Sequence, residues 1–293
     1  MGRRRHGYPG FNYNLNENGT VHHYGSEPGD YLTDVLSAKA VSFIDSSVAA
    51  AKPFMLQVAP FTPHRPNVAA PRDADEFPGL TAPRTPAYDK QPSDAPTWLT
   101  QIPPLTTADA EAIDREHRRR AQSVLAIDDM IGRIQQELAA KGVARNTYLV
   151  FSSDNGYHLG EHQLRAGKQT AFDTDIHVPL IVTGPGVPAD RSVAHLASSI
   201  EHHGPTRTPN DPDQAGRMSG NPPSYEAVRT ATALYVRYGN GEREYYDTGT
   251  DPFQLHNLAA TVSAGRLAPL QRALSAMAEC HNAAACQAAA RVR

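Results

Sequence analysis

Short apolar runs alternate with helical segments along the first two thirds of this chain, and this alternation limits the folds open to it. The apolar runs lie at residues 54–59, 147–151 and 178–182, and helical periodicity covers 30–51 and 106–140. Apolar runs of about four to eight residues are typical of buried strands. Strands that alternate with helices form a mostly parallel sheet flanked by helices. The sequence therefore predicts an α/β fold.

Local signals mark the ends of several elements. Asn18-Gly19 is a strong signal for a hairpin turn near the N-terminus. Thr106 and Asp109 have the spacing of a capping box at the start of the long helix, and Gly142 follows its end. We therefore expect a hairpin around residue 18 and a helix that begins after Thr106.

Charge and hydropathy exclude two classes of protein. The 293 residues carry a net charge of −3, which argues against a nucleic-acid-binding protein. No apolar run reaches the roughly 18 to 20 residues of a membrane span. The N-terminal Met-Gly-Arg-Arg-Arg-His is not followed by an apolar stretch, so no secretory signal peptide is predicted. The sequence leaves the localisation and the oligomeric state open.

The last third of the chain has a different pattern. Residues 204–223 are rich in Pro, Gly and Asp and are typical of a linker. Short strands are predicted after it at 225–230, 233–238 and 244–246, followed by an Ala-rich helix over 267–289. Cys280 and Cys286 would lie on different faces of that helix, so a disulfide between them requires a loop. A disulfide and two free thiols are equally compatible with the sequence.

Polar clusters follow two of the predicted strands, where α/β sheets commonly bind ligands. Asp154-Asn155 offers a carboxylate and an amide oxygen, which suit a hard cation such as Ca²⁺ but also suit a simple Asx turn. His64 lies between two prolines and could act as a general acid or an anion ligand, or be a solvated loop residue. Lys168 is either a point charge for an anion or a surface lysine.

Two histidines nearby have the i, i+4 spacing that can bind zinc on a helix. His158 and His162 flank Gly160, which argues against a helix at this place. Glu161 directly precedes His162, so the sequence lacks the His-Glu-x-x-His zinc signature. A zinc site is therefore not predicted.

The order of these motifs resembles the sulfatase family, and among its subgroups the N-acetylglucosamine-6-sulfatase-like and arylsulfatase members. The resemblance rests on five segments: 57–64, 153–162, 167–168, 177–186 and 244–258. It implies an alkaline-phosphatase-like α/β fold with a small C-terminal α+β subdomain. It also implies hydrolysis of sulfate esters with a formylglycine nucleophile and a bound calcium ion, Ca²⁺.

The resemblance assigns roles to individual residues. Asp154 and Asn155 would be calcium ligands, and Lys168 and His64 would be the catalytic residues that contact the sulfate. His64 could also protonate the leaving alcohol, and His158 would be a further substrate-binding residue. The expected partner is a sulfated carbohydrate or an aryl sulfate ester.

The chain also departs from the family pattern. The Cys/Ser-x-Pro/Ala-x-Arg motif that yields formylglycine is absent, and neither cysteine lies in such a motif. The paired aspartates of the family's N-terminal strand, which form the other half of the calcium site, are absent too. We therefore expect only the C-terminal part of a sulfatase: an incomplete catalytic domain over 1–200, a linker over 201–223 with a deletion near Ile200, and a subdomain over 224–293.

These departures leave several functional hypotheses. The first is a sulfuric ester hydrolase whose isolated chain is weakly active or inactive, because it lacks the nucleophile. The alternatives are a non-catalytic remnant, a module that binds sulfated glycans, and a phosphoester hydrolase of the same superfold.

Overall fold

A computed structural model describes residues 6–192, 198–204, 216 and 218–292. Internal contacts divide the chain into two units that are interleaved along the sequence. Unit 1 consists of Met1–Ala82, Asp114–Phe151 and Ile181–Ala189, and unit 2 consists of Pro83–Ile113, Ser152–Leu180 and Asp190–Arg293. The division at residues 200 and 224 rests on sequence pattern and stays a prediction.

Unit 1 begins with the predicted hairpin. Strands β1 (Tyr13–Glu17) and β2 (Thr20–Tyr24) pair antiparallel, with Glu17 opposite Thr20. The two turn residues, Asn18 and Gly19, have φ of 53° and 96°. Positive φ at both positions gives the turn that matches the twist of a two-residue hairpin, so the Asn-Gly signal is confirmed.

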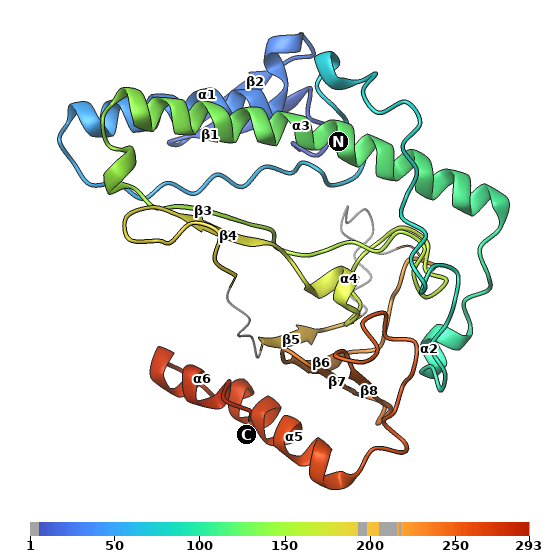
Figure 1. Cartoon of the computed structure of the whole chain (residues 1–293). Helices are drawn as coiled ribbons and strands as arrows, with labels where there is room; N and C mark the ends of the chain where they lie inside the picture. The colour runs from blue at the N-terminus through green and yellow to red at the C-terminus, as the bar shows by residue number, and fades with distance from the viewer. Residues whose placement is uncertain (1–5, 193–197, 205–215, 217, 293) are drawn as a thin grey trace. The chain divides into compact units, whose positions relative to one another are not determined.

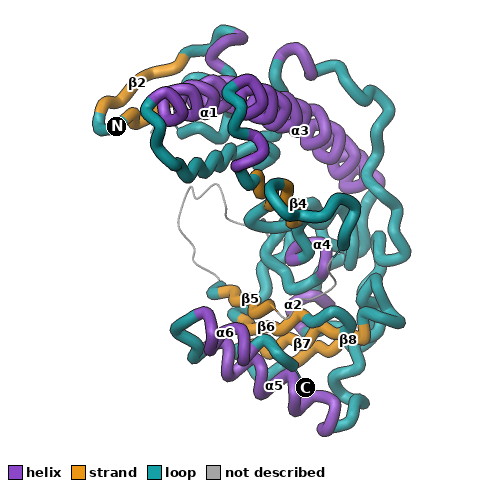
Figure 2. The backbone as a smooth tube through the Cα atoms, turned by 60° about the vertical axis from the view of Figure 1, so that its left-hand side comes forward, coloured by secondary structure: helices purple, strands orange, loops and turns teal. Residues whose placement is uncertain are grey.

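Helix α1 (Leu32–Ala49) and the long helix α3 (Thr107–Ala140) run side by side in unit 1 (Figures 1 and 2). Arg72, in the short helix η2 (Pro71–Asp73), bridges α1 and α3, because its guanidinium lies 2.7 Å from Asp34 and 2.8 Å from Asp129. The capping box is also present, because Thr106 N donates to Asp109 at 2.9 Å and Asp109 N donates to Thr106 Oγ1 at 3.2 Å. Both predicted helices are therefore confirmed.

Two of the three apolar runs form strands. Strands β3 (Leu149–Ser152) and β4 (Leu180–Thr183) make a two-stranded sheet. The strand predicted at 54–59 is wrong, since this segment has no ladder partner among the described residues. The expected burial is also missing: Val150 is 61% exposed and Leu180 is 68% exposed. An apolar run becomes a buried strand only where other backbone and side chains cover it.

Unit 2 contains an antiparallel sheet of four strands. Their order is β5 (Ser198–His202), β6 (Tyr225–Arg229), β7 (Ala233–Tyr238) and β8 (Arg243–Asp247). The sequence predicted the last three and missed β5. Alternate side chains of β7 enter different cores: Leu234 and Val236 pack with Leu99 and Phe172, while Tyr235 packs with α5. Both faces of this sheet are therefore covered.

The C-terminal helix is broken, contrary to the single helix predicted over 267–289. Helix α5 (Ala264–Ala278) lies along the β5–β8 sheet, and α6 (Ala283–Ala289) follows it (Figure 1). Asn282 caps α6 by accepting from Ala285 N at 2.9 Å. The break gives Cys280 and Cys286 a Cα–Cα distance of 5.1 Å, and they form a disulfide. The geometric requirement for a loop is thus met.

The remaining short helices are η1 (Pro28–Asp30), α2 (Thr97–Thr100), η3 (Ala144–Asn146) and α4 (Asp173–Ile176). Most of the linker predicted at 204–223 lies outside the described residues, and so does 193–197, just before Ile200. Among the helices described, none is both long and apolar enough to span a membrane.

Candidate functional site

The loop after β3 carries the predicted cation ligands. Asn155 N donates to Asp154 Oδ1 at 2.8 Å, and Asn155 Nδ2 donates to Gly156 O at 2.7 Å. Gly156 N then donates to Asp175 O at 2.7 Å. A Cβ at Gly156 would lie 2.1 Å from Thr174 O, so only glycine allows this approach. The backbone thus holds both oxygen-bearing side chains in one tight turn.

Lys168 reaches the same turn from a second loop. Its Nζ donates to Asn155 Oδ1 at 3.3 Å, and its side chain is half-buried. Three of the predicted site residues, Asp154, Asn155 and Lys168, are therefore brought together within unit 2.

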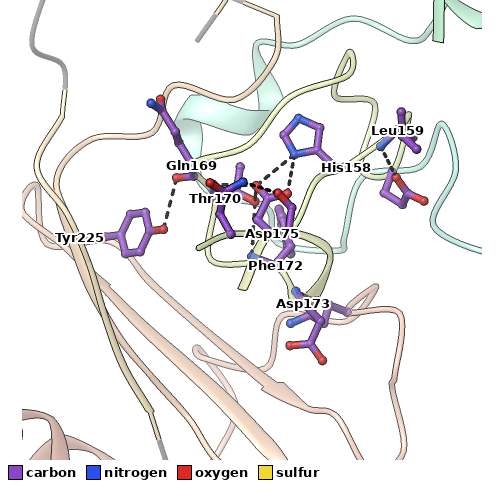
Figure 3. Close-up of polar contacts among 12 residues, drawn as sticks. His158, Leu159, Gln169, Thr170, Phe172, Asp173, Asp175 and Tyr225 are labelled. Carbon is purple, nitrogen blue, oxygen red and sulfur yellow. Dashed lines mark hydrogen bonds and ion pairs between the residues drawn. The ribbon is translucent and has the colours of Figure 1, made fainter. Parts of the chain in front are cut away.

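His158 is the most enclosed of the predicted residues. Its side chain is fully buried, and Nδ1 lies 2.9 Å from Asp175 Oδ1 and 3.0 Å from Oδ2 (Figure 3). Burial lowers the pKa of His158, but the charge and hydrogen bond of Asp175, with smaller contributions from Glu161 and the backbone of Arg165, together raise it, so the net direction is upward. A substrate could reach this ring only if the surrounding loops opened.

Sequence reasoning missed the partners of His158. Asp175 lies in α4 and is 4% exposed, and its Oδ2 also accepts from Thr170 N at 2.9 Å and Thr170 Oγ1 at 2.7 Å. The sole sequence signal was its position between Lys168 and the matched segment at 177–186. Such a buried pairing depends on chain segments that meet only after folding.

His64 lies in unit 1. Its Nδ1 is 2.9 Å from Arg65 O, and its ring packs edge-on against Tyr8 with ring centroids 4.6 Å apart. Because a carbonyl can only accept, Nδ1 carries the hydrogen in this contact. A pocket of about 10 Å³, enough for one water, is lined by His64, Phe61 and Asn67 among others.

The oxygen donors fit a calcium ion in kind but not in number. Ca²⁺ takes about six to eight oxygen ligands. Asp154 and Asn155 supply a carboxylate and one amide oxygen, and that amide oxygen accepts from Lys168. Within the described ranges, no three His, Cys, Asp or Glu side chains gather in a way that could hold a metal ion. These residues do not form a calcium site by themselves.

The disulfide decides whether a cysteine can be the nucleophile. The chain has two cysteines, Cys280 and Cys286, and they are bonded to each other. Neither is therefore available as a thiol nucleophile or as a precursor of formylglycine.

Solved structures define the class of fold. BT4656, solved in complex with its substrate D-glucosamine-2-N,6-O-disulfate, superposes with a TM-score of 0.69 at 17% identity, covering 91% of this chain and 72% of that one. A phosphonate monoester hydrolase from Silicibacter pomeroyi superposes with a TM-score of 0.57 at 18% identity, covering 90% and 63%. The chain has the alkaline-phosphatase-like fold that sulfatases and phosphonate monoester hydrolases share, and the predicted fold class is confirmed.

Sequence comparison names the family. The Sulfatase family profile matches residues 3–204, and the chain belongs to the sulfatase family. An arylsulfatase of Volvox carteri is 35% identical over 198 residues, covering 60% of this chain and 30% of that protein. The N-acetylglucosamine-6-sulfatase of Homo sapiens is 33% identical over 198 residues, covering 67% and 36%. The chain thus spans about a third of the length of these relatives.

Proposed function

We propose that this chain binds the sulfate group of a sulfated sugar or an aryl sulfate, as part of a sulfuric ester hydrolase. The observation that carries the proposal is the Lys168 ammonium, which lies 3.3 Å from Asn155 Oδ1 in a turn built by tight backbone hydrogen bonds. A lysine held in this way is a preorganised positive charge for an oxyanion. Family membership supports the choice of sulfate ester.

Each candidate residue has a distinct part in this proposal. Lys168 contacts a sulfate oxygen and balances its negative charge. For His64, which lies in unit 1, the family resemblance implies protonation of the leaving alcohol, and the proton would come from Nε2 because Nδ1 is directed at Arg65 O. Asp154 and Asn155 would supply two oxygen ligands of a calcium site, which needs about six to eight in all.

We infer that the isolated chain is weakly active or inactive. Sulfate-ester hydrolysis in this family needs a nucleophile, and the two cysteines are held in a disulfide. Binding without turnover makes a module for sulfated glycans the second candidate function. Phosphonate monoester hydrolases share the fold alone, so a phosphoester is the less supported substrate.

Titration calorimetry with inorganic sulfate and with glucosamine 6-sulfate tests the binding proposal. Lys168→Ala should weaken binding about tenfold or more, since it removes a charge-assisted contact. Lys90→Ala is the matched control, because Lys90 is exposed and lies in the same unit. No heat with either ligand, or equal affinity in both variants, would contradict the proposal.

An assay with a chromogenic aryl sulfate tests the inference that the isolated chain is weakly active or inactive. With Ca²⁺ present, we expect no turnover above that of Lys168→Ala. Saturable turnover by the unaltered chain would show that it carries a nucleophile and would overturn the inferred inactivity.

A further inference from the structure

The short loop that carries Lys168 is held at both ends. Before it, His158 and Gly167 form an antiparallel bridge: His158 N donates to Gly167 O at 2.9 Å, and Gly167 N donates to His158 O at 3.1 Å. After it, Thr170 donates its backbone N and its hydroxyl to Asp175, at 2.9 and 2.7 Å. Little freedom is left to the two residues between these anchors.

One buried pair joins the two anchors. The His158 side chain meets Asp175 at 2.9 Å, and the two side chains are 0% and 2% exposed. Figure 3 shows the ring of His158 pointing at the carboxylate that Thr170 also contacts. Charged groups buried this deeply are costly unless their geometry is good and their hydrogen bonds are satisfied. Here three donors from two residues converge on one carboxylate.

The surroundings of the other ring nitrogen argue against a ligand there. His158 Nε2 is buried and has no hydrogen-bond partner among the residues that the structure describes. A Cβ at Gly167 would lie 3.0 Å from Nε2, and one at Gly220 would lie 3.5 Å from Cε1. The ring is therefore packed against two backbone segments, and its side chain is 0% exposed.

We propose that His158 and Asp175 are a positioning pair, which holds the Lys168 loop so that its ammonium stays at Asn155, and that His158 does not contact the substrate. The role of Lys168 toward sulfate rests on the proposed function. The positioning itself rests on the contacts of His158, Gly167, Thr170 and Asp175. This assigns His158 a different part from the substrate contact that the family resemblance implies.

Chemical labelling of Lys168 reports the positioning without needing a substrate. The full chain is acylated with limiting acetic anhydride, and the rate at Lys168 is read by peptide mass spectrometry against exposed Lys90 in the same unit. His158→Phe keeps a flat ring but removes the donor to Asp175. His158→Asn keeps a donor, because its amide nitrogen is as many bonds from Cα as Nδ1 is.

We expect His158→Phe to raise the labelling of Lys168 relative to Lys90 about tenfold, since the loop would open locally. His158→Asn should stay within about twofold of the unaltered chain. Unchanged labelling in a folded His158→Phe would overturn the proposal. If His158→Phe does not fold, Thr170→Val removes the hydroxyl donor of the second anchor at similar volume and keeps its backbone donor. A rise in Lys168 labelling supports the positioning, and no rise overturns it.

Measurements of sulfate binding distinguish a failure of the positioning role from a failure of the proposed function. When both are correct, His158→Phe weakens inorganic sulfate binding about tenfold and His158→Asn restores it. Labelling that responds as expected in a chain with no affinity for sulfate would refute the proposed function and leave the positioning pair supported. If the unaltered chain binds sulfate, equal affinity in His158→Phe would overturn the inference.

Discussion

The ring of His162 stacks on the ring of Phe172 with centroids 3.7 Å apart, and the His162 side chain is buried. Within the described part of the chain its Nδ1 has no hydrogen-bond partner, so no protein contact there replaces the water lost on burial. Burial, with a smaller contribution from His158, lowers the pKa of His162 from 6.5 to about 3. Two histidines four residues apart therefore shift in opposite directions, because Asp175 contacts only His158.

The lowered pKa of His162 predicts that the fold loses stability as the pH falls. The folded pKa of His162 lies below the unfolded value, so its stabilising contribution is present above pH 6.5 and is lost as pH falls toward 3. Between pH 7 and 5 the loss from this residue should be about 2 kcal/mol. The effect of His158 has the opposite sign. Its pKa is raised in the folded state, so His158 stabilises the fold below pH 6.5, and this contribution is lost as the pH rises.

The comparison of the unaltered chain with His162→Asn isolates the first contribution. Asn tolerates the positive φ of 56° at this position. The free energy of unfolding in urea should fall less between pH 7 and 5 in the variant. The same fall in both proteins would contradict the assignment.

Glu244 gives a second prediction, in the β5–β8 sheet. Its carboxylate is buried and accepts from the hydroxyls of Tyr238 and Tyr246. Glu244→Ala should cost about 3 kcal/mol, because two buried hydroxyls lose their acceptor. Glu244→Gln should cost about 1 kcal/mol, since it keeps an acceptor and the volume. Trp98, the single tryptophan, packs against the same core, so its fluorescence can follow urea unfolding. Equal costs in the two variants would contradict this account, because Gln keeps the volume and an acceptor that Ala lacks.

The exposure of strand β3 predicts that it tolerates substitution of its apolar residues. Val150 in β3 is 61% exposed, although its sequence is that of a core strand. Val150→Thr should therefore change the free energy of unfolding by less than about 0.5 kcal/mol. Leu234→Ala in β7, where Leu234 is 0% exposed, should cost about 2 to 5 kcal/mol. Thermal melts of both variants test the contrast, and a large cost at Val150 would mean that this strand is covered.

Gly167 provides a prediction about the candidate site. A Cβ there would lie 2.6 Å from Ser219 O, a backbone atom that cannot yield easily. Gly167→Ala should thus destabilise the loop by about 1 to 3 kcal/mol and raise hydrogen exchange over 158–170. Gly265→Ala, where nothing lies within 4 Å in α5, should be neutral or stabilising by up to about 1 kcal/mol. Similar hydrogen exchange in both variants would argue against a tightly packed Lys168 loop.

Elements defined by neighbouring residues were predictable. The Asn18-Gly19 turn, the Thr106–Asp109 capping box and the periodicity of α3 each depend on contacts within a few residues. The predictions of a strand at 54–59 and of an unbroken helix over 267–289 were wrong, because apolar pattern alone does not decide either element. A strand needs a partner segment, and the C-terminal helix ends where Asn282 begins a new cap beside the disulfide.

Sequence alone identified the family, the local elements and, in unit 2, the kinds of group at the candidate site: the oxygens of Asp154-Asn155 and the ammonium of Lys168. Only the tertiary structure decided that Lys168 meets Asn155 and that His158 turns inward to Asp175. Periodicity shows which face of an element is apolar. A buried His–Asp hydrogen bond, in contrast, forms between side chains that the folded backbone brings together, so local sequence pattern does not predict it.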